Sequence, residues 1–258
     1  MKNLRYVYIL VALFLGTSVI AQNTRINDRN TIGWYGYFGT FKVNAKFSLH
    51  TEYQWRRTEL VQNWQQGLLR VGLNYQLHPN VQLRAGYAWI ETFPYGDIPI
   101  NGQGKDFTER RIYQVATVTD KIGIVDFSHR FMLEQRWVGR YTDASLDKED
   151  DFVFLNRLRY MLRLQIPLKG NAIVDGTPYF VFYNETFVGF GENVGENIFD
   201  QNRVGLLLGY RINSKVRIEG GYLNQIVMFG REINGANVIQ YNNGLIITGN
   251  FNIDFSKS

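Results

Sequence analysis

Residues 43–55 read VNAKFSLHTEYQW and alternate between two kinds of side chain. The odd-numbered positions from Val43 to Trp55 are apolar or aromatic except for Thr51, and the even-numbered positions are all polar. Successive side chains of a β-strand point to opposite faces, so this period of two predicts a strand with one apolar and one polar surface.

The same pattern recurs along most of the chain, between segments rich in turn-forming residues. We expect strands at 31–39, 43–57, 66–77, 81–89, 107–118, 124–139, 152–166, 177–188, 199–212, 215–229 and 238–255. Residues 22–30 are expected to be a polar lead-in, and residues 230–237 a loop. The connections tend to alternate long and short, which is typical of an antiparallel up-and-down barrel with short periplasmic turns and longer outer loops.

These eleven segments are an odd number, whereas single-chain barrels of bacterial outer membranes have an even number of strands. Either residues 31–39 lie outside the sheet, or Asn242-Asn243-Gly244 hides a hairpin turn within the last segment. We therefore predict an all-β, transmembrane, antiparallel up-and-down barrel of 10–12 strands, with 12 favoured. The ring must be closed, because lipid cannot satisfy the hydrogen bonds of an open sheet edge.

The first 21 residues have the three parts of a secretory signal peptide. Lys2 and Arg5 give a positive start, residues 7–20 are mostly apolar, and Ala21 ends a small-residue cleavage site. We expect residues 1–21 to be removed after Ala21, leaving residues 22–258 as one domain in the outer membrane of a Gram-negative bacterium. A membrane-anchoring helix is the alternative, but the apolar run is short and no stop-transfer pattern follows. The chain has no cysteine, which excludes disulfides and acylation of an N-terminal cysteine.

Composition and aromatic placement fit this prediction. The formal net charge is +5, but the basic residues are interspersed with acids, so we predict no nucleic-acid partner.

Trp55, Trp64, Trp89 and Trp137 lie at strand ends beside the connections expected outside, as an aromatic band at a lipid interface requires. The alternative is that large aromatic residues simply suit strand ends. Expected partners are outer-membrane lipids and the barrel-insertion machinery, which would recognise Phe255 at the end of the last strand.

Charged residues share the parity opposite to the apolar positions, so we expect them to face the barrel interior. These candidates for a lumen or selectivity role are Glu52, Arg56, Glu109, Arg111, Arg130, Glu134, Arg136, Arg157, Arg159, Arg163, Arg203, Arg217 and Glu219. The hairpin joining the segments 124–139 and 152–166 would bring Glu134 close to Arg157 or Arg159. One interpretation is a basic constriction that selects small anionic solutes. The other is a filled interior in which the charges pair across strands and hold a narrow barrel rigid.

A hydrolase needs a nucleophile and a base, and only Ser48, His50 and Glu52 share one strand face at a spacing of two. Polar residues are expected on that face in any case, and spacing alone cannot show triad geometry. No cluster of histidine, cysteine and carboxylate residues predicts a metal site, and we predict no cofactor. The acidic segment 141–151 lacks the glycine and spacing of a calcium loop.

Several short motifs spread over the chain resemble one bacterial family. They are Gly33-Trp34, Glu52-Tyr53-Gln54-Trp55-Arg56, His129-Arg130-Phe131-Met132-Leu133-Glu134-Gln135-Arg136, Arg157-Leu158-Arg159-Tyr160, Asn184-Glu185-Thr186-Phe187, Gln201-Asn202-Arg203 and Gly221-Tyr222. The chain is similar in these stretches to an uncharacterised exported family, the domain of unknown function 2490. The resemblance implies an outer-membrane barrel of Gram-negative bacteria and supplies no activity, substrate or catalytic residue.

Three functions follow as hypotheses. The first is a porin-like, narrow channel for small solutes with an arginine-lined lumen. The second is a closed structural or surface-interaction barrel whose charged interior is packed. The third is a barrel-type lipid hydrolase that uses Ser48 and His50.

Overall fold

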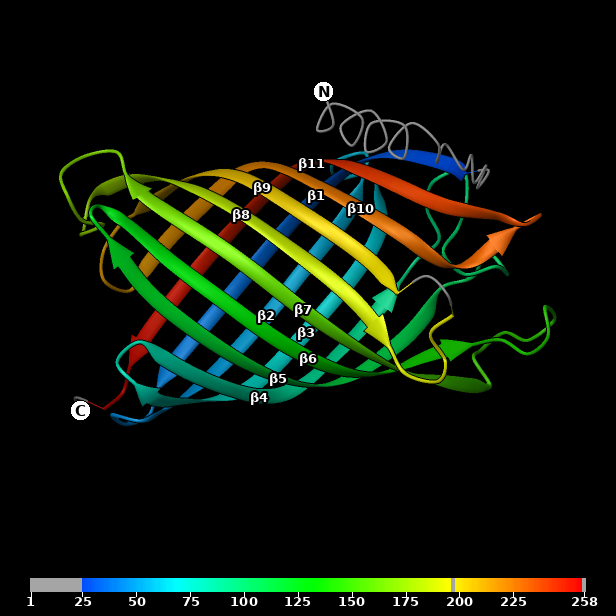
Figure 1. Cartoon of the computed structure of the whole chain (residues 1–258), viewed down its shortest axis with the longest axis horizontal. Coiled ribbons are helices and arrows are strands. Elements are labelled where there is room, and N and C mark those ends of the chain that lie inside the picture. Colours follow the sequence, from blue (N-terminus) through cyan, green and yellow to red (C-terminus); the bar gives the residue numbers. More distant parts are fainter. Residues whose placement is uncertain (1–24, 196–197, 257–258) are drawn as a thin grey trace, which may run out of the picture.

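A computed structural model describes residues 25–195 and 198–256 of the chain. The described residues form one sheet that closes into a barrel (Figure 1). Its strands are β1 (Arg25–Lys42), β2 (Phe47–Thr58), β3 (Asn63–His78), β4 (Val81–Thr92), β5 (Phe107–Ile122), β6 (Val125–Arg140), β7 (Asp151–Pro167), β8 (Thr177–Phe190), β9 (Phe199–Arg211), β10 (Val216–Ile233) and β11 (Ala236–Asp254). The predicted signal peptide lies outside the described residues. Within those residues, no helix is long and apolar enough to span a membrane.

Consecutive strands pair antiparallel, but the barrel is closed by a parallel pair, β1 and β11. Their register runs without interruption from Arg25 opposite Asn237 to Lys42 opposite Asp254. A parallel closure requires an odd number of strands, and the described residues form eleven. The start of β1 and the end of β11 therefore lie at opposite ends of the barrel.

The prediction of 12 strands is wrong, and so is the turn suggested at Asn242-Asn243-Gly244. These residues lie in the middle of β11, where Gly244 is paired with Ile32 of β1. A Cβ atom on Gly244 would lie 1.7 Å from the Ile32 carbonyl oxygen. The glycine thus permits a close approach of β1 and β11. Asn242-Asn243-Gly244 resembles a turn because it is short and polar, but β11 has polar side chains at its inward positions.

Most strands also differ from the predicted ranges at one or both ends, and three of these differences change how a segment is interpreted. The expected lead-in is part of β1, which begins at Arg25 because its first residues pair with β11. The strand expected from Val43 begins only at Phe47, as β2. Residues 43–46 form a turn, in which the Asn44 side chain accepts hydrogen bonds from the Lys46 and Phe47 amides. The loop expected at 230–237 is a two-residue hairpin turn. Its residues Asn234 and Gly235 have φ values of 52° and 75°, as the Asn-Gly sequence of a type I′ turn allows.

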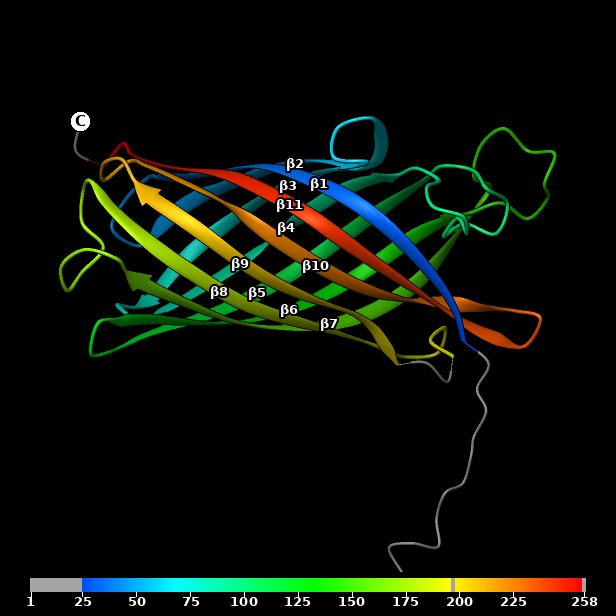
Figure 2. The same ribbon diagram turned by 90° about the horizontal axis from the view of Figure 1, so that it is seen from above.

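The two ends of the barrel differ in their connections. At the turn end, the strands are joined by residues 43–46, 79–80, 123–124, 168–176 and 212–215. At the loop end, they are joined by residues 59–62, 93–106, 141–150, 191–198 and 234–235. β10, β11 and β1 reach further at the loop end than the strands beside them, and Figure 2 shows them extending past the rim.

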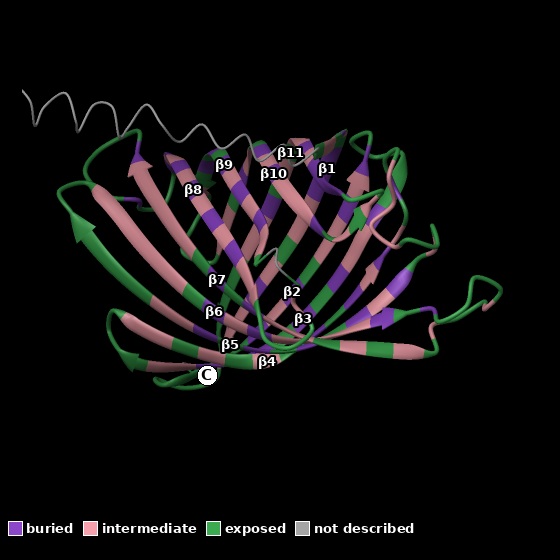
Figure 3. Ribbon diagram, turned by 45° about the vertical axis from the view of Figure 1, so that its right-hand side comes forward, coloured by how far each residue is buried: buried purple, intermediate pink, exposed green. Residues whose placement is uncertain are grey.

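Burial is inverted relative to a water-soluble protein. On β2, the apolar Phe47, Leu49 and Tyr53 are exposed, whereas Glu52 is 3% exposed and His50 4%. The same alternation of buried and exposed positions follows the strands around the barrel (Figure 3). The outer surface is therefore largely apolar, and the interior carries the charges. An exposed apolar surface of this extent marks contact with a partner or a membrane.

Several inward tyrosine rings pack over glycines of the neighbouring strand and fill the space that a side chain would occupy there. Tyr113 is opposite Gly86, Tyr179 opposite Gly209, and Tyr183 opposite Gly205. A Cβ atom on Gly205 would lie 2.1 Å from the ring of Tyr183, so ring and glycine occupy complementary space. Pairs of this kind fix the register between strands.

We predict that Gly205→Ala lowers the free energy of unfolding by about 1–3 kcal/mol, because the buried Tyr183 ring must shift. Urea unfolding of the refolded protein, followed by tryptophan fluorescence, measures the change. Gly230→Ala is the matched control, since no atom lies within 4 Å of a Cβ built at that strand position. Equal unfolding midpoints for the two variants would contradict the proposed packing.

Candidate functional site

A cavity of about 660 Å³ runs along the inside of the barrel. Its lining includes Ile100 and Gly230 near the loop end and reaches Thr40 and Asn252 near the turn end. A second cavity at the turn-end mouth shares Thr40 and Asn252 and is lined by three lysines. These are Lys42, Lys46 and Lys215; Asp254 also lines this cavity and is paired with Lys42 at 3.3 Å. The two cavities share these lining residues, so the second cavity lies beside the turn-end part of the first.

Twelve of the thirteen charged residues expected to face inward line this cavity. They are Glu52, Arg56, Glu109, Arg111, Arg130, Arg136, Arg157, Arg159, Arg163, Arg203, Arg217 and Glu219. The thirteenth, Glu134, does not line the cavity and is completely buried among arginines.

Glu134 is the centre of the largest ion-pair network. Its carboxylate oxygens lie 2.6 Å from Arg157 Nη2, 2.9 Å from Arg159 Nη1 and 3.4 Å from Arg111 Nη1. Arg70 Nη2 is also within reach at 3.9 Å. Both arginines that the hairpin register placed near Glu134 are thus bonded to it. A buried carboxylate requires such partners, because an unpaired charge in a water-poor interior is strongly unfavourable.

Other carboxylates are shared in the same way. Glu185 lies 2.7 Å from both Arg130 and Arg159, and Glu109 bonds Arg111 and Arg136. Three further pairs complete the network, namely Glu52 with Arg70, Asp200 with Arg157, and Glu219 with Arg163. Most interior arginines are therefore held in fixed positions by at least one carboxylate.

Arginines nevertheless outnumber acids inside the barrel. Ten arginines line the cavity, and five carboxylates line it with them; adding the buried Glu134 gives six acids, so the formal excess is 10 − 6 = 4 positive charges. Two of these ten arginines, Arg56 and Arg217, have no carboxylate of the described residues within 4.0 Å. A narrow space lined by uncompensated guanidinium groups attracts anions.

The prediction from sequence missed several members of the network. Arg70, Glu185 and Asp200 line the cavity, and so does Trp34. The parity rule would have found Arg70, because it alternates with the apolar Leu69 and Val71 of β3. Nothing in the alternation distinguishes Trp34, which is 3% exposed, from the outward tryptophans.

The loop 93–106 crosses the loop-end mouth. It joins β4 to β5, yet the Tyr95 hydroxyl donates to Gln240 of β11 at 2.5 Å and accepts from Asn242 at 3.1 Å. Arg231 of β10 donates to the Pro99 carbonyl at 2.6 Å. β1, β2 and β3 separate β4 from β11 in the sheet, so these contacts anchor the loop on the far side of the opening. Burial raises the pKa of Tyr95 to about 12, so its hydroxyl remains a donor at neutral pH.

The residues considered for a hydrolase face the interior and do not form a triad. His50 Nε2 lies 3.2 Å from Glu52 Oε2, but the Ser48 hydroxyl accepts a bond from Asn74 Nδ2 at 2.9 Å. Among the described residues, no hydrogen bond joins Ser48 to His50. All three side chains are buried inside the barrel, away from the apolar outer surface that a lipid substrate would contact.

The four tryptophans expected to form a band all lie within three residues of the loop-end limits of their strands. Trp64 and Trp89 are exposed on the outer surface. The Trp55 and Trp64 rings are 6.1 Å apart, and Trp137 packs against Phe154. Their placement forms an aromatic row near one rim. Phe255 stacks on Phe41 at the turn end.

Comparison with curated proteins and with solved structures gives no match. The family model described as a protein of unknown function, DUF2490, matches residues 31–232, a range that reaches from β1 into β10. The chain therefore belongs to the DUF2490 family.

Proposed function

We propose that this protein is an outer-membrane β-barrel that provides a narrow passage for small anions. The observation that carries the proposal is the excess of arginine over carboxylate along a cavity that lies beside a second cavity at the turn-end mouth. Fixed positive charges lining a pore favour anionic solutes over cations.

The inverted burial supports the membrane location. Leu49, Tyr53, Leu69 and Leu73 are exposed on the outer face of neighbouring strands, where lipid tails would satisfy them. The closed sheet leaves the strands no unpaired edge within a bilayer. We assign the short turns to the periplasm and the loop end to the outside, with residues 1–21 directing export and being removed.

The passage would work through a division between paired and unpaired arginines. Arg157 and Arg159 are fixed by Glu134 and contribute rigidity, whereas Arg56 and Arg217 have uncompensated charge. Anions would be attracted at the turn end by the lysines of the mouth and then follow the guanidinium groups inward. The loop 93–106 narrows the other end and limits the size of the solute.

We predict that Arg217→Gln reduces the anion preference of the refolded protein in a planar bilayer. One fixed charge of the passage is lost, so the reversal potential in a potassium chloride gradient should move toward zero. Arg110→Gln is the control, because Arg110 is exposed on the outer face. An identical shift in both variants, or none in Arg217→Gln, would contradict a role for the interior charges.

The second candidate is a closed structural barrel, and the complete burial of Glu134 among four arginines favours it. In this case, Arg217→Gln would change thermal stability without any change in permeability. Swelling of proteoliposomes in small anionic and cationic solutes separates the two candidates. Swelling in neither solute would support the closed barrel.

A further inference from the structure

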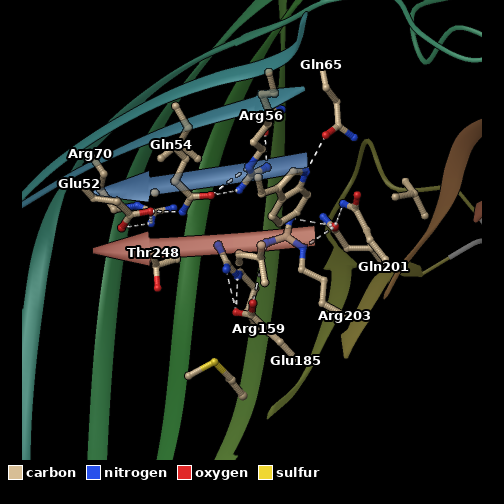
Figure 4. Close-up of a pocket in the computed structure, with 18 of the residues that line it drawn as sticks. Glu52, Gln54, Arg56, Gln65, Arg70, Arg159, Glu185, Gln201, Arg203 and Thr248 are labelled. Atoms are coloured by element: carbon tan, nitrogen blue, oxygen red, sulfur yellow. Dashed lines mark hydrogen bonds and ion pairs between the residues drawn. The ribbon is translucent and has the colours of Figure 1, made fainter. Parts of the chain in front are cut away.

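Two guanidinium groups lie against one buried indole ring inside the barrel. The Cζ atom of Arg56 is 3.9 Å from the ring centroid of Trp34, and the Cζ atom of Arg203 is 4.8 Å from it. The two Cζ atoms can therefore be no more than 8.7 Å apart, the sum of these distances. Figure 4 shows both side chains reaching the same part of the cavity from β2 and β9.

These two arginines are oriented by neutral amides. Arg56 donates to Gln54 Oε1 at 2.9 and 2.7 Å and also bonds Gln66. Arg203 donates to Gln201 Oε1 at 3.2 and 3.0 Å, and its nearest carboxylate oxygen, on Glu185, is 3.9 Å away. An amide oxygen fixes the plane of a guanidinium without cancelling its charge. The pair therefore differs from Arg157 and Arg159, which have carboxylates at 2.6–2.9 Å.

Both side chains retain unused donors. A guanidinium has five N–H groups. The amide bonds described above use three donors of Arg56 and two of Arg203. Both residues line the cavity, although Arg56 is 5% exposed and Arg203 9%. Two positive groups are thus held on one indole ring, no more than 8.7 Å apart and mostly out of water, with donors available and no carboxylate in direct contact.

The surrounding amides form a rigid frame. The indole nitrogen of Trp34 donates to Gln65 at 2.6 Å, and Gln225 donates to Gln201 at 2.7 Å. Arg56, Arg203 and Trp34 therefore have fixed positions before any ligand arrives. Such preorganisation lowers the entropic cost of binding.

We propose that Arg56 and Arg203 bind one oxyanion, a phosphate, sulfate or carboxylate group, at a specific site within the passage. The fork of donors on a guanidinium matches two oxygens of such a group better than it matches a spherical halide. The inference rests on the proposed function in that the solute reaches the site through the cavity. It adds a saturable site and a solute class to a general preference for anions.

The test measures equilibrium binding of radiolabelled inorganic phosphate to the refolded full-length protein in detergent, with sodium chloride in excess. We expect saturable binding of one phosphate per chain, displaced by sulfate or acetate. The double variant Arg56→Gln/Arg203→Gln should weaken binding roughly tenfold or more, since charge-assisted bonds to the ligand are lost.

Arg57→Gln is the matched control. Arg57 also lies against tryptophans, with its Cζ atom 5.0 Å from the Trp55 ring and 4.7 Å from the Trp64 ring, but it is on the outer side of the strand. This variant should bind phosphate like the wild type. If the double variant fails to fold, as judged by heat-modifiable migration, Arg56→Lys provides the test. It keeps the charge but loses the fork, so phosphate binding should weaken while chloride selectivity is kept.

The outcomes separate the site from the channel. Anion-selective current without saturable phosphate binding would overturn the site and leave the channel intact. Saturable phosphate binding that depends on Arg56 and Arg203, without any current, would support the site and contradict the channel. Phosphate binding that is equal in the wild type and in the folded variants would overturn the site.

Discussion

Glu134→Gln is expected to lower the free energy of unfolding by about 3–5 kcal/mol, the cost of removing one partner from a buried ion-pair network. Four arginines share this carboxylate, and its exposure is 0%. The neutral amide cannot compensate their charge, so repulsion between Arg111, Arg157 and Arg159 rises in a water-poor interior. Urea unfolding in lipid vesicles, followed by tryptophan fluorescence, measures the loss.

The control is Asp126→Asn, which breaks the exposed pair of Lys121 and Asp126. Surface ion pairs contribute about 0–1 kcal/mol, so this variant should remain close to the wild type. Arg157→Gln combined with Glu134→Gln should cost less than the sum of the single changes, because each single variant already removes their shared bond. Equal stability losses for Glu134→Gln and Asp126→Asn would contradict the network's structural role.

Removing most of the loop 93–106 is expected to raise the conductance several-fold, since the loop crosses the loop-end mouth. Replacing residues 95–104 by a short glycine-serine connection deletes Tyr95 and the carbonyl acceptors of Arg231 together. Single-channel recording measures the result, and larger solutes should then enter in swelling assays.

Shortening the acidic loop 141–150 to the same extent is the control. This loop contacts the loop 93–106 through Lys105, which donates to the Ala144 carbonyl at 2.7 Å, but it has no bond to β10 or β11 among the described residues. We expect a smaller change in conductance from it. An unchanged conductance after shortening 93–106 would show that the narrowest point lies elsewhere.

The strands and their inward charges were predictable because one rule governs both. Alternation at a period of two locates a strand and assigns each side chain to a face, so the sequence alone places Arg157 and Glu134 inside the barrel. The hairpin between β6 and β7 then fixed which charges meet.

The strand number and the ends of the barrel were not predictable in this way. The parallel pairing of β1 with β11 depends on contacts between residues more than two hundred positions apart, which local alternation does not encode. The local sequence predicts a turn at Gly244, but in the barrel this glycine allows β11 to approach β1 closely. The path of Tyr95 across the mouth depends on Gln240 and Asn242, whose partners no local pattern specifies.

The division of arginines also needed the structure. All ten cavity-lining arginines look alike in the sequence, yet Arg157 is bonded to two carboxylates and Arg56 to amides alone. In the proposed passage, rigidity would come from the arginines that are paired with carboxylates, and selectivity from those that are held by amides.

The most direct test of an anion passage is the reversal potential of the refolded wild-type protein in a planar bilayer with a potassium chloride gradient. We expect steady single-channel currents whose reversal potential has the sign of chloride selectivity, because the interior has four excess positive charges. A folded, heat-modifiable barrel that gives no current, or a current selective for potassium, would contradict an anion passage.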